Sequence, residues 1–592
     1  MEEVLSHYFG YQKFRPGQRE IISYVLDGQH TLGVLPTGGG KSLCYQVPGL
    51  KLSGTTLVIS PLISLMKDQV DQLKTMGVSA AYLNSSQSTK EQQEIEAQLR
   101  AGEIKFLYVA PERLEQPRFV ALLRRLSIAL VAFDEAHCIS KWGHDFRPSY
   151  QAVIHTVLAL PQRFAIVALT ATATAEVQQD IMQRLYIQSN HVVKTSIKRR
   201  NLIFEVNPTY QREKFVIQYI KQHAQASGIV YCATRKQVEA LHNALEDAGV
   251  SATFYHAGRS AKEREVAQND FLYDRTRVVV ATNAFGMGID KSNVRFVIHY
   301  NMPGDLESYY QEAGRAGRDG LESDCILLFT ERDIGLHEYF ITSSKADEDY
   351  QDKMGEKLTK MIHYTKTKQC LEATLVHYFE PNERLEECGH CSNCIAKNKT
   401  YNMTKEAKMI ISCVARLNQQ ESYQTVIQVL RGEQSDYIQH QGFSDLSTYG
   451  IMKEYTTGEL HHLIDEMRFK GYLNAQDEIL LCDDTVKQIL KDETQVHTTP
   501  FRRKSKEIVK INTVEGVDRK LLEQLLEVRQ KLSDKLQVPP VNIFTDFTLE
   551  EFAKRKPTSK QDMIQIEGVG SYKLKHYCPA FLEVIQAYKT TA

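Results

Sequence analysis

The chain has 592 residues, of which 42% are hydrophobic and 24% charged, a composition typical of a globular protein with several domains. Its 72 basic and 73 acidic residues give a net charge of −1, which excludes a uniformly basic protein but not a local basic groove for nucleic acid. The acidic and then polar start, MEEVLSHYFG, and the lack of a long apolar run argue against a signal peptide and a membrane span.

Residues 1–205 alternate short apolar runs with helical stretches. The runs are typical of buried parallel strands, and they cover residues 31–35, 55–60, 105–110, 128–135 and 164–169. Such an alternation predicts a doubly wound α/β sheet. The pattern restarts in residues 206–343, with runs at 227–232, 251–256, 276–282 and 294–300. We therefore expect a multidomain α/β protein with two tandem lobes, each built on a parallel sheet.

A glycine-rich turn follows the first strand in the segment GVLPTGGGKS. Backbone N–H groups of such a turn bind nucleotide phosphates, Lys41 would reach the β and γ phosphates, and Ser42 would hold Mg²⁺. The pattern G-x-x-x-x-G-K-S/T fails at its first glycine, where Leu35 stands. An ordinary glycine turn before a helix is the alternative. The predicted loop consists of Thr37, Gly38, Gly39, Gly40, Lys41 and Ser42.

An acidic pair, Asp134 and Glu135, ends the apolar strand 128–135. In open α/β sheets, ligands bind at the carboxyl ends of strands. Asp134 would hold Mg²⁺ directly or through water, and Glu135 would polarise the attacking water. A solvated acidic strand end is the alternative. The hydroxyl-rich segment ALTATAT (168–174) ends the next strand and would link the nucleotide to nucleic acid.

The second lobe contains the segment YYQEAGRAGRDG, which carries Arg315 and Arg318 one helical turn apart. An arginine that reaches across a cleft between lobes can stabilise charge on a transferring phosphoryl group. We expect Arg318 to be that residue. Two arginines on the solvated face of a glycine-rich helix are the alternative.

With these motifs the chain resembles superfamily 2 helicases and, more closely, the RecQ family in its bacterial form. FGYQKFRPGQ (9–18) resembles the family's N-terminal nucleotide motif, which implies that Gln18 reads the adenine edge and that Tyr11 and Arg15 enclose its ring. Four further segments resemble motifs Ia, Ib, V and VI: SPLISLMKDQV (60–70), YVAPERL (108–114), ATNAFGMGIDK (281–291) and QEAGRAGRDG (311–320). The resemblance covers nearly the whole chain and implies two RecA-like lobes.

The only tryptophan lies just after the acidic pair, in ISKWGHDFRPSY (139–150). This stretch resembles the aromatic-rich loop of the RecQ family. Trp142 and Phe146 would stack on single-stranded bases, and His144 and Arg147 would add stacking or phosphate contacts. Because the loop is so near the acidic pair, we expect it to couple DNA binding to ATP hydrolysis. A core tryptophan beneath a loop is the alternative.

Four of the eleven cysteines lie within residues 344–403. In a reducing cytoplasm such a cluster indicates metal ligation rather than disulfides. The C-x-x-C steps between Cys388, Cys391 and Cys394, with Cys370 on a preceding helix, predict a structural zinc site of four thiolates. An iron–sulfur cluster and a redox pair are the alternatives.

Residues 404–490 resemble the RecQ winged helix, with GYLNAQDEILL as its hairpin wing. The module would grip duplex DNA through phosphates, or alternatively bind a protein. Residues 491–513 are polar and charged and are expected to be a linker. The residues expected to face the winged-helix core are Leu460, Ile464, Met467 and Leu473.

Residues 514–592 resemble an HRDC domain, a small helical bundle. Its turn Gly568–Gly570 is suited to a backbone amide contact with phosphate. An ordinary tight turn between helices is the alternative.

The resemblance implies an ATP- and Mg²⁺-dependent DNA helicase that moves 3′ to 5′, with roles in recombination, replication, repair and the SOS response. It implies tailed or forked DNA, single-stranded and duplex, as the ligand, with zinc as a structural metal. Single-strand-binding protein and topoisomerase are the suggested partners of a monomer in the cytoplasm, at the nucleoid. A DEAH-type RNA helicase and a non-catalytic, strand-binding scaffold are the alternatives.

Overall fold

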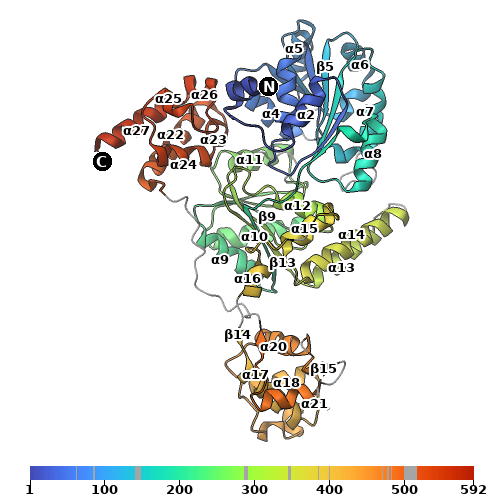
Figure 1. Cartoon of the computed structure of the whole chain (residues 1–592), viewed down its shortest axis with the longest axis vertical. Helices are drawn as coiled ribbons and strands as arrows, with labels where there is room; N and C mark the ends of the chain where they lie inside the picture. The colour runs from blue at the N-terminus through green and yellow to red at the C-terminus, as the bar shows by residue number, and fades with distance from the viewer. Residues whose placement is uncertain are drawn as a thin grey trace. The chain divides into compact units, whose positions relative to one another are not determined.

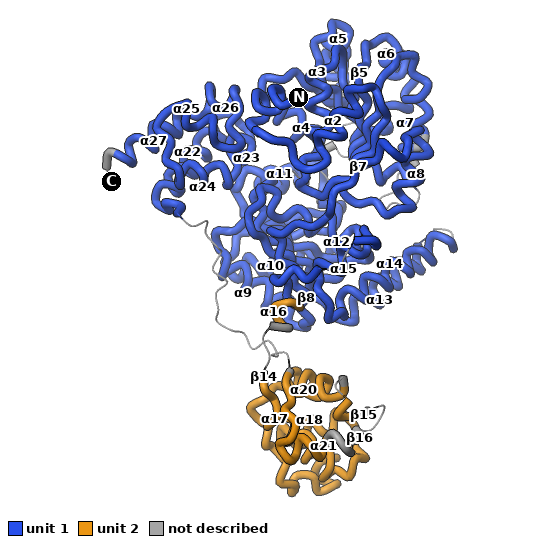
Figure 2. Tube along the Cα trace, in the orientation of Figure 1, with its two compact units in different colours: residues 1–392, 509–592 blue, residues 393–508 orange. Residues whose placement is uncertain are grey.

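The computed structural model describes residues 1–61, 63–84, 87–140, 148–285, 291–344, 348–383, 386–398, 401–469, 471–475, 479–481, 483–498 and 516–591. It divides into two compact units (Figure 2). The first comprises residues 1–392 with 509–592, and the second residues 393–508. None of the described helices is long and apolar enough to cross a membrane.

The first lobe is built on a seven-stranded sheet in the order β3-β4-β2-β5-β6-β1-β7, and its strand pairs are parallel. Helices lie on both faces (Figure 1). The strands are β1 Thr31–Val34, β2 Thr55–Ile59, β3 Ala80–Leu83, β4 Phe106–Val109, β5 Ile128–Phe133, β6 Ala165–Thr170 and β7 Val192–Lys194. The helices are α1 Glu2–Val4, α2 Gln18–Leu26, α3 Leu43–Lys51, α4 Ile63–Thr75, α5 Thr89–Arg100, α6 Pro117–Leu123, α7 Pro148–Leu158 and α8 Ala175–Leu185, with a π-helical turn at Leu5–Phe9.

The second lobe contains a six-stranded parallel sheet in the order β10-β11-β9-β12-β13-β8. Both sheets bear out the predicted fold class. The strands are β8 Leu202–Pro208, β9 Ser227–Tyr231, β10 Ala252–Tyr255, β11 Val278–Ala281, β12 Val294–His299 and β13 Ser323–Phe329. The helices are α9 Arg212–Gln222, α10 Arg235–Asp247, α11 Ala261–Leu272 and α12 Leu306–Ala313.

The strands of the first lobe are mostly apolar because both faces of the sheet are buried. Leu57 and Ile59 of β2 join one core cluster, while Val58 between them joins the cluster on the opposite face. Successive side chains of a strand point to opposite faces, so a sheet covered by helices on both sides favours apolar residues on both faces of each strand.

Helices and a cysteine cluster follow the second lobe. They are α13 Arg332–Thr342, α14 Glu348–Lys366, α15 Leu371–Phe379 and α16 Ser392–Asn398. The chain ends in a bundle with its own core: α22 Arg519–Leu536, α23 Pro540–Ile543, α24 Asp546–Arg555, α25 Lys560–Met563, α26 Ser571–His576 and α27 Cys578–Thr591.

The second unit is a helical module with a hairpin. Leu460, Ile464, Met467 and Leu473 are all buried in its core, as predicted. The hairpin pairs β15 with β16 in an antiparallel arrangement, at the position predicted for the wing. Its elements are β14 Tyr401–Asn402, α17 Thr404–Arg416, α18 Tyr423–Arg431, α19 Asp436–His440, α20 Thr457–Phe469, β15 Leu473–Ala475, β16 Ile479–Leu481, α21 Asp483–Leu490 and β17 His497–Thr498.

The expected linker at 491–513 begins later than the sequence suggests. β17 pairs with β14 in an antiparallel arrangement, so residues up to Thr498 belong to the second unit. The sequence gives no sign of this pairing, because β17 is only two residues long and both of its residues are polar. The remainder, from residue 499, lies outside the described residues.

Candidate active site

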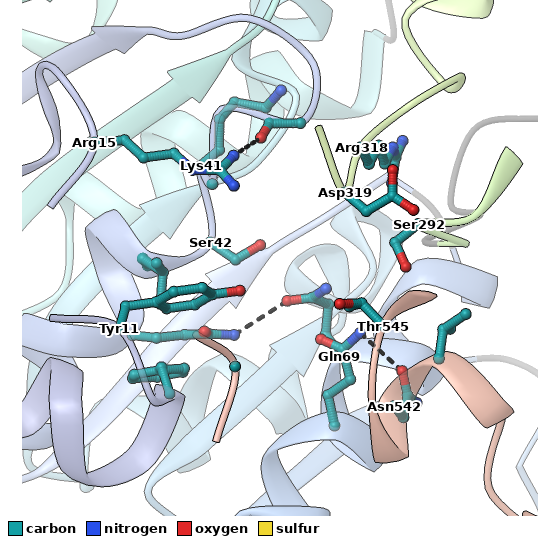
Figure 3. Close-up of a pocket in the computed structure, with 18 of the residues that line it drawn as sticks. Tyr11, Arg15, Lys41, Ser42, Gln69, Ser292, Arg318, Asp319, Asn542 and Thr545 are labelled. Atoms are coloured by element: carbon teal, nitrogen blue, oxygen red, sulfur yellow. Dashed lines mark hydrogen bonds between the residues drawn. The ribbon is translucent and has the colours of Figure 1, made fainter. Parts of the chain in front are cut away.

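One cavity of about 340 Å³ gathers nearly all the residues predicted to act on a nucleotide. Both lobes line it, and so does the C-terminal bundle (Figure 3). The predicted residues in its wall are Tyr11, Arg15, Gln18, Thr37, Gly38, Gly40, Lys41, Ser42, Asp134, Glu135, Arg315 and Arg318. Gly39 lies within the same loop.

The phosphate loop forms where β1 ends and before α3 begins. Gly38 and Gly40 adopt φ angles of +77° and +75°, a left-handed conformation that favours glycine. A Cβ on Gly40 would also lie 2.4 Å from Nε2 of Gln18. Leu35, which breaks the expected glycine pattern, is 1% exposed and packs in the core beneath the sheet. The departure is therefore a packing position that leaves the glycine turn intact.

The N-terminal nucleotide motif is bonded directly to this loop. Nε2 of Gln18 donates to the carbonyls of Gly39 and Gly40, at 3.1 and 3.0 Å. Its Oε1 accepts from the Arg15 backbone N–H at 2.9 Å, and the Arg15 side chain donates to the Gly38 carbonyl. The amide group expected to read adenine thus also holds the phosphate loop in place.

The acidic pair lies at the carboxyl end of β5, beside Lys41. Asp134 is 7% exposed, and its Oδ1 accepts from the Glu135 N–H at 3.1 Å. Glu135 adopts a φ of +48°, which is uncommon for a residue with a side chain and is typical of functional sites. Burial lowers the pKa of Lys41, and the carboxylates of Glu135 and Asp134 oppose that shift. The pair therefore favours the charged ammonium that phosphate binding needs.

A buried polar chain connects Glu135 to the hydroxyl-rich segment that follows β6. Nδ1 of His137, a residue that is 1% exposed, lies 3.4 Å from Oε2 of Glu135 and 3.0 Å from Oγ1 of Thr170. The Thr170 hydroxyl donates to the Thr172 carbonyl at 3.1 Å. These contacts place His137 between the Glu135 carboxylate and the segment ALTATAT.

Arg315 and Arg318 line the cavity, but they do not lie on a helix as the sequence suggested. α12 ends at Ala313, and the residues after it form turns in which Gly317 has a φ of +57°. This turn abuts the phosphate loop: a Cβ on Gly314 would lie 2.9 Å from the Thr37 Cβ. The absence of a Cβ at Gly314 allows the two lobes to approach this closely.

Arg199 is a site residue that sequence reasoning missed. It lies in the segment between the lobes, and its guanidinium donates to three carbonyls of the turn that carries Arg315 and Arg318. The basic stretch KRRN between two strands was the available signal. No motif in the sequence distinguishes Arg199 from an arginine on the solvated surface.

The C-terminal bundle also contributes to the cavity, which the sequence did not predict. Asn542, Thr545 and Lys573 line it, and Asn542 Oδ1 accepts from Nε2 of Gln72 on α4 at 3.3 Å (Figure 3). Burial lowers the pKa of Lys573 to about 8.

The turn expected to contact phosphate faces the first lobe. The Gly568 N–H donates to the Gly10 carbonyl at 3.3 Å. A Cβ on Gly570 would lie 2.9 Å from the Tyr8 carbonyl oxygen. The two backbones therefore pack directly against each other.

Trp142, His144, Phe146 and Arg147, expected to stack on and contact single-stranded DNA, lie outside the described residues. The described residues on either side are close to the acidic pair. Tyr150 of α7 is fully buried, and its hydroxyl donates to the Asp134 carbonyl at 3.3 Å. On the C-terminal side of these residues, Tyr150 is therefore bonded to the backbone of the acidic pair.

The four clustered cysteines converge at the start of α15. The Sγ atoms of Cys370, Cys388, Cys391 and Cys394 all lie within 4.8 Å of one another, which suits one tetrahedral zinc ion. The Cys388 N–H donates to Cys370 Sγ at 3.3 Å, a bond that stabilises thiolate charge. His390 lies outside this set, with its Nδ1 2.9 Å from the Cys388 carbonyl.

Family models match five consecutive parts of the chain. They are a DEAD/DEAH box helicase domain (15–181), a helicase conserved C-terminal domain (211–320), a RecQ zinc-binding domain (331–395), an RQC domain (397–507) and an HRDC domain (518–585).

Three relatives illustrate the range of similarity. The ATP-dependent DNA helicase RecQ of Bacillus subtilis is 42% identical over 99% of this chain and 98% of its own length. The protein of the same name from Haemophilus influenzae is 39% identical over 99% of this chain and 96% of its own. A putative ATP-dependent RNA helicase of Acanthamoeba polyphaga mimivirus is 35% identical over 80% of this chain and 88% of its own. With the domains in this order over nearly its whole length, the chain belongs to the RecQ family of ATP-dependent DNA helicases.

Proposed function

We propose that the chain hydrolyses ATP with Mg²⁺, moves 3′ to 5′ along single-stranded DNA and separates duplex DNA ahead of it. The observation that carries the proposal is the cavity that joins Lys41 and Glu135 of one lobe to Arg315 and Arg318 of the other. Because the hydrolytic groups are divided between lobes, hydrolysis and lobe movement would depend on each other.

The groups of the first lobe would bind and activate the reactants. Lys41 would neutralise the β and γ phosphates, and Glu135 would polarise the attacking water. Ser42 and Asp134 both line the cavity and offer the oxygen ligands that Mg²⁺ prefers. They would hold the ion, which supplies positive charge beside the phosphates when bound.

The adenine end would be held by Tyr11, Arg15 and Gln18. All three line the cavity, and the bonds from Gln18 to Gly39 and Gly40 support a coupling between base recognition and the phosphate loop. A nucleotide with another base would then bind without bringing the phosphate loop into the conformation needed for hydrolysis.

Arg318 is proposed as the arginine that stabilises the transferring phosphoryl group, with Arg315 as its neighbour. Cα and Cγ of Arg318 lie 3.5 Å from the place where a Cβ on Gly38 would lie, which supports this role. Charge beside a transferring phosphoryl group accelerates the reaction without chemistry of its own.

Single-stranded DNA would stimulate hydrolysis through the aromatic loop. Trp142 and Phe146 would stack on bases, with His144 and Arg147 beside them. The contact of Tyr150 with the Asp134 carbonyl supports transmission from the loop's end to the acidic pair.

The winged helix and the HRDC domain would add DNA contacts, mostly to phosphates. Tailed or forked DNA is the proposed substrate, with single-strand-binding protein and topoisomerase as partners of a monomer. The proposed setting is DNA recombination, replication and repair at the nucleoid.

Strand displacement tests the proposal. The purified chain, ATP and Mg²⁺ would be incubated with a duplex carrying a 3′ tail, one carrying a 5′ tail and an RNA duplex. We expect the protein to unwind only the 3′-tailed DNA. Lys41→Ala should reduce the rate about 100-fold or more, because the group that binds the phosphates is lost.

Other outcomes would favour the alternatives. Preference for the RNA duplex would keep the motor but change the substrate, as the name of the mimiviral relative suggests. DNA binding without unwinding or ATP hydrolysis, equal in the unaltered chain and Lys41→Ala, would favour a scaffold.

A further inference from the structure

The segment between the two lobes makes unusual contacts for a connection. Arg199 lies between β7 and β8, and its side chain faces the second lobe. Its Nη1 donates to the Gly314 carbonyl at 2.6 Å, and its Nη2 donates to those of Ala316 and Gly317 at 2.9 and 2.5 Å. One guanidinium therefore binds three carbonyls of the turn that follows α12, and the third of them, that of Gly317, also accepts from the Gly320 N–H at 3.1 Å.

The bonded turn is the one that carries the two active-site arginines. Arg315 lies between the two carbonyls that Arg199 contacts first, and Arg318 directly follows the third. The Arg199 Cζ is also 3.6 Å from the place where a Cβ on Gly38 would lie. The guanidinium thus sits beside the phosphate loop and the turn from the opposite lobe.

The rest of the segment is anchored as well. The Ile197 N–H donates to Oε1 of Glu380, just after α15, at 2.9 Å, and the Ile197 carbonyl accepts from the Tyr310 hydroxyl at 2.7 Å. Asn201 Nδ2 donates to the Gly317 and Leu321 carbonyls at 2.8 and 2.9 Å. Arg199 is therefore held at both sides by residues with partners of their own.

We propose that Arg199 is a positioning residue for ATP hydrolysis: it sets the turn from Gly314 to Gly317 so that Arg315 and Arg318 face the phosphate loop. Arg199 itself does not touch the reactants in this proposal. It acts through the turn, and the bond between Ile197 and Glu380 ties its position to the helix that follows the first zinc-binding cysteine. The inference rests on the proposed function of Arg318.

A guanidinium suits this role better than an ammonium. Its planar fork donates in several fixed directions at once, so it can hold carbonyls on successive residues of one turn. A lysine has a single nitrogen on a flexible stem and would reach one or two of these carbonyls with less directional control. The identity of the residue should therefore matter more than its charge.

Steady-state ATP hydrolysis with saturating single-stranded DNA tests the proposal in the full chain. We expect Arg199→Ala to lower kcat about tenfold or more, because small displacements of catalytic groups are costly, while KM for ATP changes less than about twofold. Arg199→Lys should recover only part of the rate, and added guanidinium ion should partly restore Arg199→Ala. Arg200→Ala is the matched control, since Arg200 is the next residue and is exposed.

A double variant separates positioning from general damage. If Arg199 acts through Arg318, then Arg199→Ala combined with Arg318→Ala should be no slower than Arg318→Ala alone, because residues that act as a unit are not additive. Multiplied losses in the double variant would overturn the proposal. So would an unchanged kcat in Arg199→Ala.

Hydrogen exchange supplies a readout that does not need activity. Peptides covering residues 314–321 should lose protection in both Arg199 variants but not in Arg200→Ala, with zinc content unchanged. Unchanged protection in Arg199→Ala would overturn the proposal. Absence of ATP hydrolysis by the unaltered chain, with protection lost in Arg199→Ala, would instead refute the proposed function while supporting the structural role of Arg199.

Discussion

His137 shows how one residue can join two motifs. It is buried between the carboxylate of Glu135 and the hydroxyl of Thr170, which come from the ends of two neighbouring strands. The rotamer of a histidine in such a place is restricted, because both of its neighbours lie at the ends of paired strands. The same imidazole nitrogen thus lies near the Glu135 carboxylate and a hydroxyl of the next strand.

Thr170→Val should separate these motifs while keeping the side-chain shape. Loss of the hydroxyl removes the 3.0 Å contact with His137 Nδ1, so that Glu135 should be held less firmly. We expect kcat for DNA-stimulated ATP hydrolysis to fall about tenfold, with KM for ATP nearly unchanged. Thr170→Ser keeps the hydroxyl and should retain most of the rate. Full activity of the valine variant would contradict the role of this chain.

Among the secondary-structure elements, α15 begins at an N-cap residue that is also one of the clustered cysteines. Cys370 is its N-cap residue, and the Cys370 Sγ accepts from the Ala373 N–H at 3.5 Å, as well as from the Cys388 N–H. A short helix and an adjacent loop thus share their contacts with a single cluster of thiols. Their folding should be inseparable from metal binding.

Metal removal tests this dependence. We expect one zinc and no iron per chain, and chelation should unfold α15 and α16 together, since a structural zinc ion contributes about 10 kcal/mol or more. Exchange protection across residues 370–394 should disappear, while the first sheet stays protected. Detection of iron in place of zinc would contradict the assignment of the metal.

How far the elements were predictable depended on burial. The strands of the sheet interiors were predicted because two covered faces require continuous apolar residues, as in β5 and β9. β3, β7 and β8 were missed; all three are edge strands and are short or mixed in character. β13 was missed as well, although its run CILLF is continuously apolar and its signal was therefore present in the sequence.

The site was predictable to the extent that its residues belong to local motifs. The cavity brings together Lys41, Glu135 and Arg318 as their motifs implied. Arg199 and Asn542 were beyond sequence reasoning because their importance comes from contacts between distant segments. The helix expected under Arg315 was wrong, because α12 ends at Ala313 and Gly317 in the following turn has a left-handed φ of +57°.

At the scale of the first unit, the C-terminal bundle contacts both lobes. The Tyr273 hydroxyl of the second lobe donates to the Gln537 carbonyl at 3.0 Å, while Gly568 bonds Gly10 of the first. Burial raises the pKa of Asp546, but Arg529, Arg295 and Lys291 outweigh burial and lower it. Charges of the second lobe therefore attract the bundle.

Glu550 should make this docking sensitive to pH. The pKa of Glu550 is raised from 4.5 to about 7, mainly by burial and then by the charges of Asp546 and Asp319. Glu551 adds to this rise, and Arg295 opposes it. A raised carboxyl pKa favours docking while the group is protonated, so docking should weaken as pH rises from about 4.5 to about 7 and level off above that. Protection factors for residues 566–571 should fall accordingly.

Glu550→Gln is the control for that series. It removes the titrating group, so the protection factors should vary little between pH 5 and pH 8. Another group would govern docking if the protection factors of the unaltered chain rose with pH. The same conclusion would follow if Glu550→Gln showed the same pH dependence as the unaltered chain.

Gly570 has a consequence for how the sequence can drift over evolutionary time. Its φ of −83° suits any amino acid, and serine or aspartate would cap α26 better than glycine does. It is the backbone of the first lobe that demands a hydrogen there, because the Tyr8 and His7 carbonyl oxygens lie 2.9 and 3.1 Å from where a Cβ would lie. The HRDC domain by itself is therefore free to vary at this position, whereas the joined chain is not. Homologues whose HRDC domain does not rest on the helicase lobes should carry capping side chains at the position of Gly570.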